Sequence, residues 1–161
     1  MSTIANHIII IALVLLSGCS TSPPDYKSEN ISFQFTEVGW KEIDPDKSNY
    51  ATYKQDNHSL MVVNSYCKKY ENTSLRTLRK QILAGIQNTK IIDTNQSSFK
   101  NRDILTTKAK GVIDGITRYF QINIFRKNRC LYDFMLITTT KELLKLEEKS
   151  LTKLMKGSYI P

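Results

Sequence analysis

Histidine is scarce in this chain of 161 residues, which contains His7 and His58 and no other. Histidine is the side chain that most often serves as a catalytic base near neutral pH, so its scarcity argues against acid–base catalysis. The six glycines form no phosphate-binding loop, and the G-x-S-x-G motif of serine hydrolases is missing. We therefore expect neither enzymatic activity nor a cofactor. A hydrolase would have to bring His58 together with a serine and a carboxylate in a deep pocket.

Long apolar runs are also missing, with one exception near the N-terminus. Residues 8–16 are nine consecutive apolar residues, far fewer than the roughly 20 that a membrane-spanning helix needs. A run of this length is typical of the central region of an export signal. The positive charge that usually precedes such a region is absent, because no lysine or arginine stands before residue 8. The alternative is a buried N-terminal strand or helix.

The apolar run ends in Leu16-Ser17-Gly18-Cys19, and this tetrad resembles the lipobox of bacterial lipoproteins. The resemblance implies that residues 1–18 are a signal peptide and that Cys19 becomes the acylated first residue, which anchors the chain in a membrane. Several acyl chains together anchor a protein stably in a membrane, because each buried methylene contributes about 0.8 kcal/mol to the free energy of membrane binding. The residue after Cys19 is Ser20 and not aspartate. This resembles the pattern of lipoproteins that a two-membrane bacterium sorts to the outer membrane, and the domain would then face the periplasm. An inner-membrane or cell-surface position stays open.

Cysteine is rare as well: besides Cys19, the chain has only Cys67 and Cys130. An exported chain meets an oxidising compartment, where one remaining pair favours a disulfide. Such a bond would close a long loop and stabilise the fold by about 4 kcal/mol in the chain-entropy model. The alternative is two buried thiols. These two cysteines and His58 lack the clustered spacing of a zinc site, so we expect no metal.

Acidic residues are fewer than basic ones, 15 against 23, which gives a formal net charge of +8. The basic residues form scattered clusters, among them Lys100 with Arg102 and a lysine series from Lys141 to Lys156. A basic surface attracts phosphate-bearing lipids, polymers or acidic proteins. We expect no nucleic acid, because the chain carries an export signal and its clusters lack interleaved aromatic residues. The turn Arg126-Lys127-Asn128-Arg129 is the candidate interaction surface, with a solubilising turn as the alternative.

Alternation of apolar and polar residues predicts a chain dominated by strands. After a polar tether over residues 19–30, we expect a single domain over residues 31–161. Asp114-Gly115 predicts a tight hairpin turn. The first three predicted strands are expected to form a meander. The predicted strands cover residues 31–35, 50–54, 59–67, 90–94, 103–113, 116–125 and 130–138.

Two helices are expected from apolar residues at spacings of three and four. Potential N-cap residues at 72–74 precede the first, which carries an apolar stripe. The second covers about residues 141–156, with Leu144 and Leu151 near Leu146 on one side. The resulting order, β-β-β-α-β-β-β-β-α, indicates an α+β protein in which helices cover an antiparallel β-sheet.

The element order and a few residues resemble the PsbP/Mog1-like fold over the whole predicted domain. The residues are Phe33-x-Phe35 leading to Gly39-Trp40 and the strand that ends at Asn64–Cys67, followed by the helix and the long hairpin. The proline that often precedes the tryptophan turn in that fold is absent, because Val38 stands there. The resemblance implies a non-enzymatic α/β/α sandwich that serves as an accessory or protein-binding module. It carries over no functional residue.

From the anchor and the resemblance we expect a membrane-anchored periplasmic lipoprotein that acts as a non-catalytic binding or assembly accessory. Its partners would be the membrane, through the lipid anchor, and an envelope protein. The alternative function is binding of anionic lipids or polymers through a basic surface. Salt separates the two functions, because ionic contacts weaken steeply as salt rises and apolar docking does not.

Overall fold

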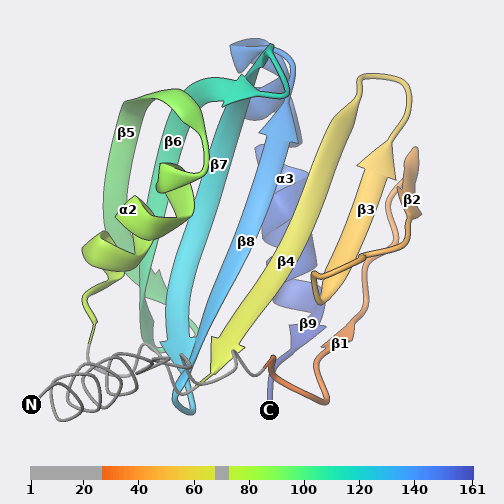
Figure 1. Ribbon diagram of the computed structural model, residues 1–161. Coiled ribbons are helices and arrows are strands. Elements are labelled where there is room, and N and C mark those ends of the chain that lie inside the picture. Colours follow the sequence, from red (N-terminus) through yellow and green to blue (C-terminus); the bar gives the residue numbers. More distant parts are fainter. Residues whose placement is uncertain (1–26, 68–72) are drawn as a thin grey trace, which may run out of the picture.

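The computed structural model describes residues 27–67 and 73–161. In these residues the chain forms an α/β/α sandwich, in which helix α3 (Lys141–Gly157) covers one face of an antiparallel sheet and helix α2 (Leu75–Ala84) covers part of the other (Figure 1). The predicted α+β class is thus confirmed. The predicted signal peptide, Cys19 and the tether up to residue 26 lie outside the described residues.

The main sheet has seven strands in the described residues, in the order β2-β3-β4-β8-β7-β6-β5, and every neighbouring pair is antiparallel. A separate pair is formed by β1 (Ser32–Phe33) and β9 (Ser158–Tyr159), so the two ends of the domain lie together. The strands of the main sheet are β2 (Trp40–Glu42), β3 (Tyr50–Lys54), β4 (Ser59–Cys67), β5 (Gln87–Phe99), β6 (Arg102–Ile113), β7 (Ile116–Lys127) and β8 (Cys130–Thr138).

The predicted meander of the first three strands is wrong in its first member. The strand expected at residues 31–35 is the short β1, which pairs with β9 and not with β3. Its place beside β3 is taken by β2. The physical reason is packing: the Phe33 ring stacks on Tyr50 at 4.6 Å between centroids, and Gln34 N donates to Gly157 O at 3.0 Å. The ring contact packs β1 against the start of β3, and the hydrogen bond holds it beside the end of α3.

Three two-residue turns set the hairpins of β5 to β8. Both central residues of each turn have positive φ, as type I′ turns require: 48° and 61° at Lys100-Asn101, 51° and 75° at Asp114-Gly115, and 48° and 65° at Asn128-Arg129. The predicted hairpin at Asp114-Gly115 is confirmed. Since successive strands run in opposite directions, the first and third turns lie at one end of the sheet and the second at the other.

Side-chain caps fix where the helices begin. The hydroxyl oxygen of Ser74 accepts a hydrogen bond from Thr77 N at 3.1 Å, and that of Thr140 accepts one from Leu143 N at 3.2 Å. The predicted apolar side of α3 is wrong at Leu146, which is 66% exposed. Its neighbour Glu147 is buried instead, because one residue turns the side chain by about 100° around a helix.

The sheet has a core on each face. Strands β7 and β8 contribute to both, because consecutive side chains of a strand point to opposite faces. Residues 120–125 of β7 and residues 130–134 of β8 are therefore all buried, as expected of central strands covered on both sides. The α3 face contains Met61, Phe134, Leu136, Leu151 and Leu154, and the α2 face contains Leu78, Ala109, Phe120, Ile122 and Leu131.

Candidate functional site

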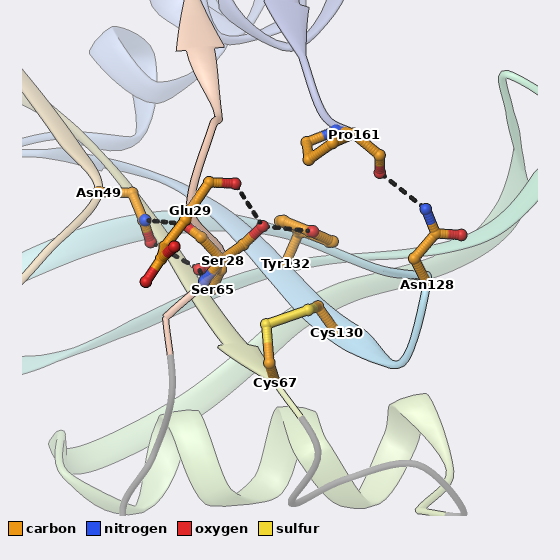
Figure 2. The surroundings of a disulfide bond; sticks show 9 residues. All are labelled: Ser28, Glu29, Asn49, Ser65, Cys67, Asn128, Cys130, Tyr132 and Pro161. Atoms are coloured by element: carbon orange, nitrogen blue, oxygen red, sulfur yellow. Dashed lines mark hydrogen bonds between the residues drawn. A yellow bond between two sulfur atoms is a disulfide. The ribbon is translucent and has the colours of Figure 1, made fainter.

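Several distant segments meet at one end of the sheet, which we call the terminal pole. It comprises the start of the described chain at Ser28, the turns Lys100-Asn101 and Asn128-Arg129, the disulfide of Cys67 and Cys130, and the C-terminal residues 158–161 (Figures 1 and 2). The strand register brings them together, since β4 ends and β8 begins at this end. Basic residues from separate parts of the sequence therefore become neighbours here.

The predicted cysteine pair is present as a disulfide. Cys67, the last residue of β4, lies directly opposite Cys130, the first residue of β8, and their Cα atoms are 4.0 Å apart. Figure 2 shows the bond beside the segment where the chain enters the domain. It ties two neighbouring strands of the sheet, which are 63 residues apart in the sequence.

Ser28 fastens the incoming chain to the sheet through both its backbone and its side chain. Its backbone N donates to Ser65 Oγ at 2.8 Å, and its hydroxyl oxygen accepts from Tyr132 Oη at 3.0 Å. Its carbonyl oxygen accepts from Asn49 Nδ2 at 3.3 Å (Figure 2). Ser65 in turn donates to Asn49 Oδ1 at 2.9 Å, which closes a small network. The chain thus enters the domain at a fixed point within the predicted tether.

The C-terminal segment is held at the same pole by side chains of the two hairpin turns. Asn128 Nδ2 donates to the Pro161 carbonyl oxygen at 2.9 Å, and Lys127 Nζ donates to the carbonyl oxygen of Ile160. Lys100 Nζ lies 3.3 Å from the carbonyl oxygen of Ser158. The last residues of the chain are therefore clamped between two basic turns.

A small cavity of about 230 Å³ lies between these segments. Its basic lining residues are Lys100, Arg102 and Lys127, and Phe99 and Phe125 supply an apolar wall. The side chains of all three cations already donate to backbone carbonyls. The cavity is thus a site of concentrated positive charge at the terminal pole.

The predicted interaction surface does not form one patch. Lys127 lines the basic cavity, whereas Arg126 points to the other face of the sheet, because neighbouring residues of a strand alternate. Nε of Arg126 is buried and has no hydrogen-bond partner among the described residues. Arg129 is exposed in the turn itself. The structure instead joins Lys127 to Lys100 and Arg102, which the sequence places in a different cluster.

Sequence reasoning missed a buried carboxylate. Asp133 on β8 is 1% exposed, and its Oδ1 accepts from Asn64 Nδ2 at 3.0 Å. Burial raises the pKa of Asp133 to about 6, and the hydrogen bond from Asn64 opposes that rise. The available signal was a single acidic residue between apolar neighbours in a predicted strand.

His58 lies on the exposed turn between β3 and β4, where its Nδ1 is 2.5 Å from the Tyr53 hydroxyl. It lines an apolar cavity of about 540 Å³ with Leu60, Ile113 and Ile137, and the described lining of that cavity contains neither a serine nor a carboxylate. In residues 27–67 and 73–161, no group of three or more histidine, cysteine, aspartate or glutamate side chains could hold a metal ion. Neither described helix has the length and apolar character needed to cross a bilayer.

No protein-family model matches the chain, and no curated protein matches it. Several solved structures resemble it in fold. PsbP of the cyanobacterium Synechocystis sp. PCC 6803 superposes with a TM-score of 0.53 at 8% identity, over 92% of this chain and 99% of that one. LpqN of Mycobacterium tuberculosis, described as involved in cell envelope biogenesis, gives a TM-score of 0.56 at 5% identity over 86% of each chain.

The Ran-binding protein Mog1p of Saccharomyces cerevisiae gives a TM-score of 0.55 at 8% identity, over 86% of this chain and 96% of that one. At such low identities the likeness shows the fold alone. The chain has the PsbP/Mog1-like fold that its element order resembles.

Proposed function

We propose that this chain is a bacterial lipoprotein whose single domain acts as a non-catalytic binding or assembly accessory in the cell envelope. Residues 1–18 are then removed as a signal peptide, Cys19 carries the lipid anchor, and the domain faces the periplasm from the outer membrane. The tetrad at residues 16–19 and Ser20 support the anchor and its address. The described involvement of LpqN in cell envelope biogenesis supports a role in the envelope.

The observation that carries the proposal is where the chain enters the domain. Ser28 is fastened at the terminal pole, and eight residues separate it from Cys19. Since eight extended residues span at most about 30 Å, an acylated Cys19 would hold the terminal pole close to the bilayer surface. The opposite end of the sheet, with the turn Asp114-Gly115, would then point away from the membrane, where an envelope partner can reach it.

Intact-mass analysis of the native protein tests the anchor. We expect a chain that begins at Cys19 and carries the mass of its acyl groups. Cys19→Ala should leave the signal peptide uncleaved and the chain without acyl groups. The control is Cys67→Ala with Cys130→Ala, which removes the disulfide pair without leaving an unpaired thiol and should leave acylation of Cys19 intact. A native chain that still begins at Met1 and has no added mass would overturn the proposal.

Site-specific crosslinking in intact cells tests the accessory role. A photoreactive residue at Ile116 lies on the apolar cavity at the end of the sheet that points away from the terminal pole, and Ile116 is 52% exposed. The control position is Lys145, exposed on α3. We expect one envelope protein to be captured reproducibly through Ile116 and not through Lys145. Failure to capture any protein reproducibly from either position would contradict an accessory role.

A second candidate function, binding of anionic headgroups or polymers, is favoured by the three cations that line the cavity at the terminal pole. A chain that begins at Ser20 lacks both the anchor and the apolar run of residues 8–16, so any vesicle binding must come from the protein surface. We expect it to bind vesicles with anionic phospholipid and to release as salt rises. Lys100→Gln with Arg102→Gln, both in the cavity lining, should weaken this binding more than Lys145→Gln with Lys149→Gln, which removes equal charge from α3. Equal losses in both double variants would exclude a specific basic pole.

A further inference from the structure

A third concave surface lies on the α3 face of the sheet, beside the outer strands. This polar groove has a volume of about 340 Å³ and is bounded by β5, β6 and β7 on one side and by α3 on the other. Its neutral hydrogen-bonding side chains include Asn95, Ser97, Thr106, Gln121, Asn123 and Thr152. The volume falls within the range of small-molecule sites, roughly 300–1,000 Å³.

The strand register arranges the floor of the polar groove in rows. Asn95, Thr106 and Asn123 are paired in succession across β5, β6 and β7. Within this row the Thr106 hydroxyl donates to Asn123 Oδ1 at 2.9 Å, and Asn123 Nδ2 lies 3.0 Å from the sulfur of Met155. The amide of Asn123 is therefore fixed in orientation before any ligand arrives, whereas Asn95 on the outermost strand is exposed.

Gln121 adds an independent observation, an unpaired polar atom in this floor. Its side chain lines the polar groove, the residue is 3% exposed, and its Oε1 has no hydrogen-bond partner among the described residues. A buried carbonyl oxygen without a donor destabilises a protein, and native structures rarely keep one. A hydroxyl or amide N–H group of a ligand in the polar groove would supply the missing donor.

The charges around the polar groove disfavour an anionic ligand. Lys108 is its only described basic lining residue, and its Nζ lies 2.9 Å from Glu148 Oε2. Asp93, which pairs with Lys108 across the two strands, adds a second carboxylate. Phosphate and carboxylate groups would meet this negative charge, so the polar groove suits a neutral ligand, in contrast to the basic cavity at the terminal pole.

We propose that the polar groove binds a neutral saccharide. Sugar hydroxyl and acetamido groups can both donate and accept, which matches the mixture of amide and hydroxyl side chains. Phe99 lines both the polar groove and the basic cavity, and it adds apolar surface at the boundary between them for the C–H groups of a sugar. This site gives the domain a ligand beyond the proposed function, and it does not depend on a lipid anchor or on a protein partner.

Isothermal titration calorimetry on the full chain tests the proposal, with a neutral tetramer of N-acetylglucosamine as the probe. The protein is kept in a zwitterionic detergent, because glycoside detergents carry sugars. Asn95→Ala should weaken binding about tenfold, the effect of one lost hydrogen bond. The matched control is Gln96→Ala on the same strand, which does not line the polar groove and should bind as the wild type does.

Gln121→Leu gives a second readout that is independent of the first. It should abolish saccharide binding and raise the melting temperature of the free protein, because it removes a buried oxygen without a partner at nearly constant volume. If Gln121→Leu does not fold, the comparison of Asn95→Ala with Gln96→Ala still decides. Cosedimentation with insoluble cell-wall glycan and with vesicles of a neutral glycolipid then identifies the source of the saccharide.

Three results would overturn the proposal. The tetramer could fail to bind at millimolar concentration, Asn95→Ala could bind as tightly as Gln96→Ala, or binding could occur only with a carboxylated oligosaccharide or a peptide. Each of these results leaves the acylation of Cys19 untouched, so failure of the saccharide site and failure of the proposed function are distinguishable.

Discussion

The side-chain amide of Asn64 donates to Oδ1 of Asp133 at 3.0 Å, from β4 to the neighbouring strand β8. The other carboxylate oxygen of Asp133 is buried and has no hydrogen-bond partner among the described residues. With a pKa of about 6, this carboxyl group is mostly ionised at neutral pH in a place that water does not reach. The ionised carboxylate of Asp133 therefore lowers the free energy of unfolding at neutral pH.

Asp133→Asn should stabilise the protein at neutral pH and have little effect in acid. Because the pKa of Asp133 lies above its ordinary value of 3.8 in the folded state, the folded protein holds this proton more tightly, and wild-type stability falls as pH rises from about 4 to about 6. The gain at pH 7.5 should reach up to about 3 kcal/mol. Urea unfolding of both proteins at pH 4, 5.5 and 7.5 measures it. A difference that is the same at every pH would contradict this account.

The pair of Lys54 and Glu147 should make the opposite contribution. Glu147 is 2% exposed on α3 and accepts hydrogen bonds from Lys54 Nζ and Asn57 Nδ2, both at 2.8 Å, and from Ser150 Oγ at 3.1 Å. Burial alone would raise the pKa of Glu147, but these hydrogen bonds and the Lys54 charge outweigh it and lower the pKa. A lowered pKa gives stability that is present at neutral pH and lost as the pH falls below the ordinary value of 4.5.

Glu147→Gln should therefore destabilise the protein at pH 7 by roughly 1–3 kcal/mol, with a smaller effect in acid. The matched control is Glu148→Gln, because its ion pair with Lys108 has a similar length, 2.9 Å, and is partly exposed. The Glu148→Gln control should lower the free energy of unfolding by no more than about 0.5 kcal/mol. Thermal unfolding at pH 7 and pH 4 compares them, and equal losses for the two variants would show that burial of the Glu147 pair is unimportant.

The Cys67–Cys130 disulfide should contribute about 2–4 kcal/mol, because it links two strands that are far apart in the sequence. A reducing agent should lower the melting temperature of the wild type. Cys67→Ala with Cys130→Ala should lower it by a similar amount and remove any further response to the reductant. If the double variant still responds, the effect of the reductant comes from elsewhere.

Gly157→Ala should be severely destabilising. A Cβ atom at Gly157 would lie 2.1 Å from the carbonyl oxygen of Gln34, a backbone atom that cannot move without breaking the contact of β1 with the end of α3. We expect a loss of more than about 2 kcal/mol in the free energy of unfolding. Gly85→Ala is the control, since a Cβ there meets no described atom within 4 Å. Similar melting temperatures for the two variants would refute the clash.

Local patterns in the sequence predicted the elements well. The boundaries of β3, β4 and β8 match the expected residues 50–54, 59–67 and 130–138. The pair Asp114-Gly115 turns as its composition requires. β5 extends beyond the predicted residues 90–94. The prediction was too short because this edge strand is exposed over residues 91–98 and its sequence therefore shows little apolar alternation.

The sequence by itself determined the class of the fold, the hairpin at residues 114–115 and the availability of one cysteine pair, because periodicity, turn chemistry and cysteine count are local properties. Only the tertiary structure decided that Cys67 faces Cys130, that Lys127 joins Lys100 and Arg102, and that the polar rows of β5 to β7 line a groove beside α3. These relationships arise from the order and register of strands, which depend on contacts along the whole chain at once and not on any short segment.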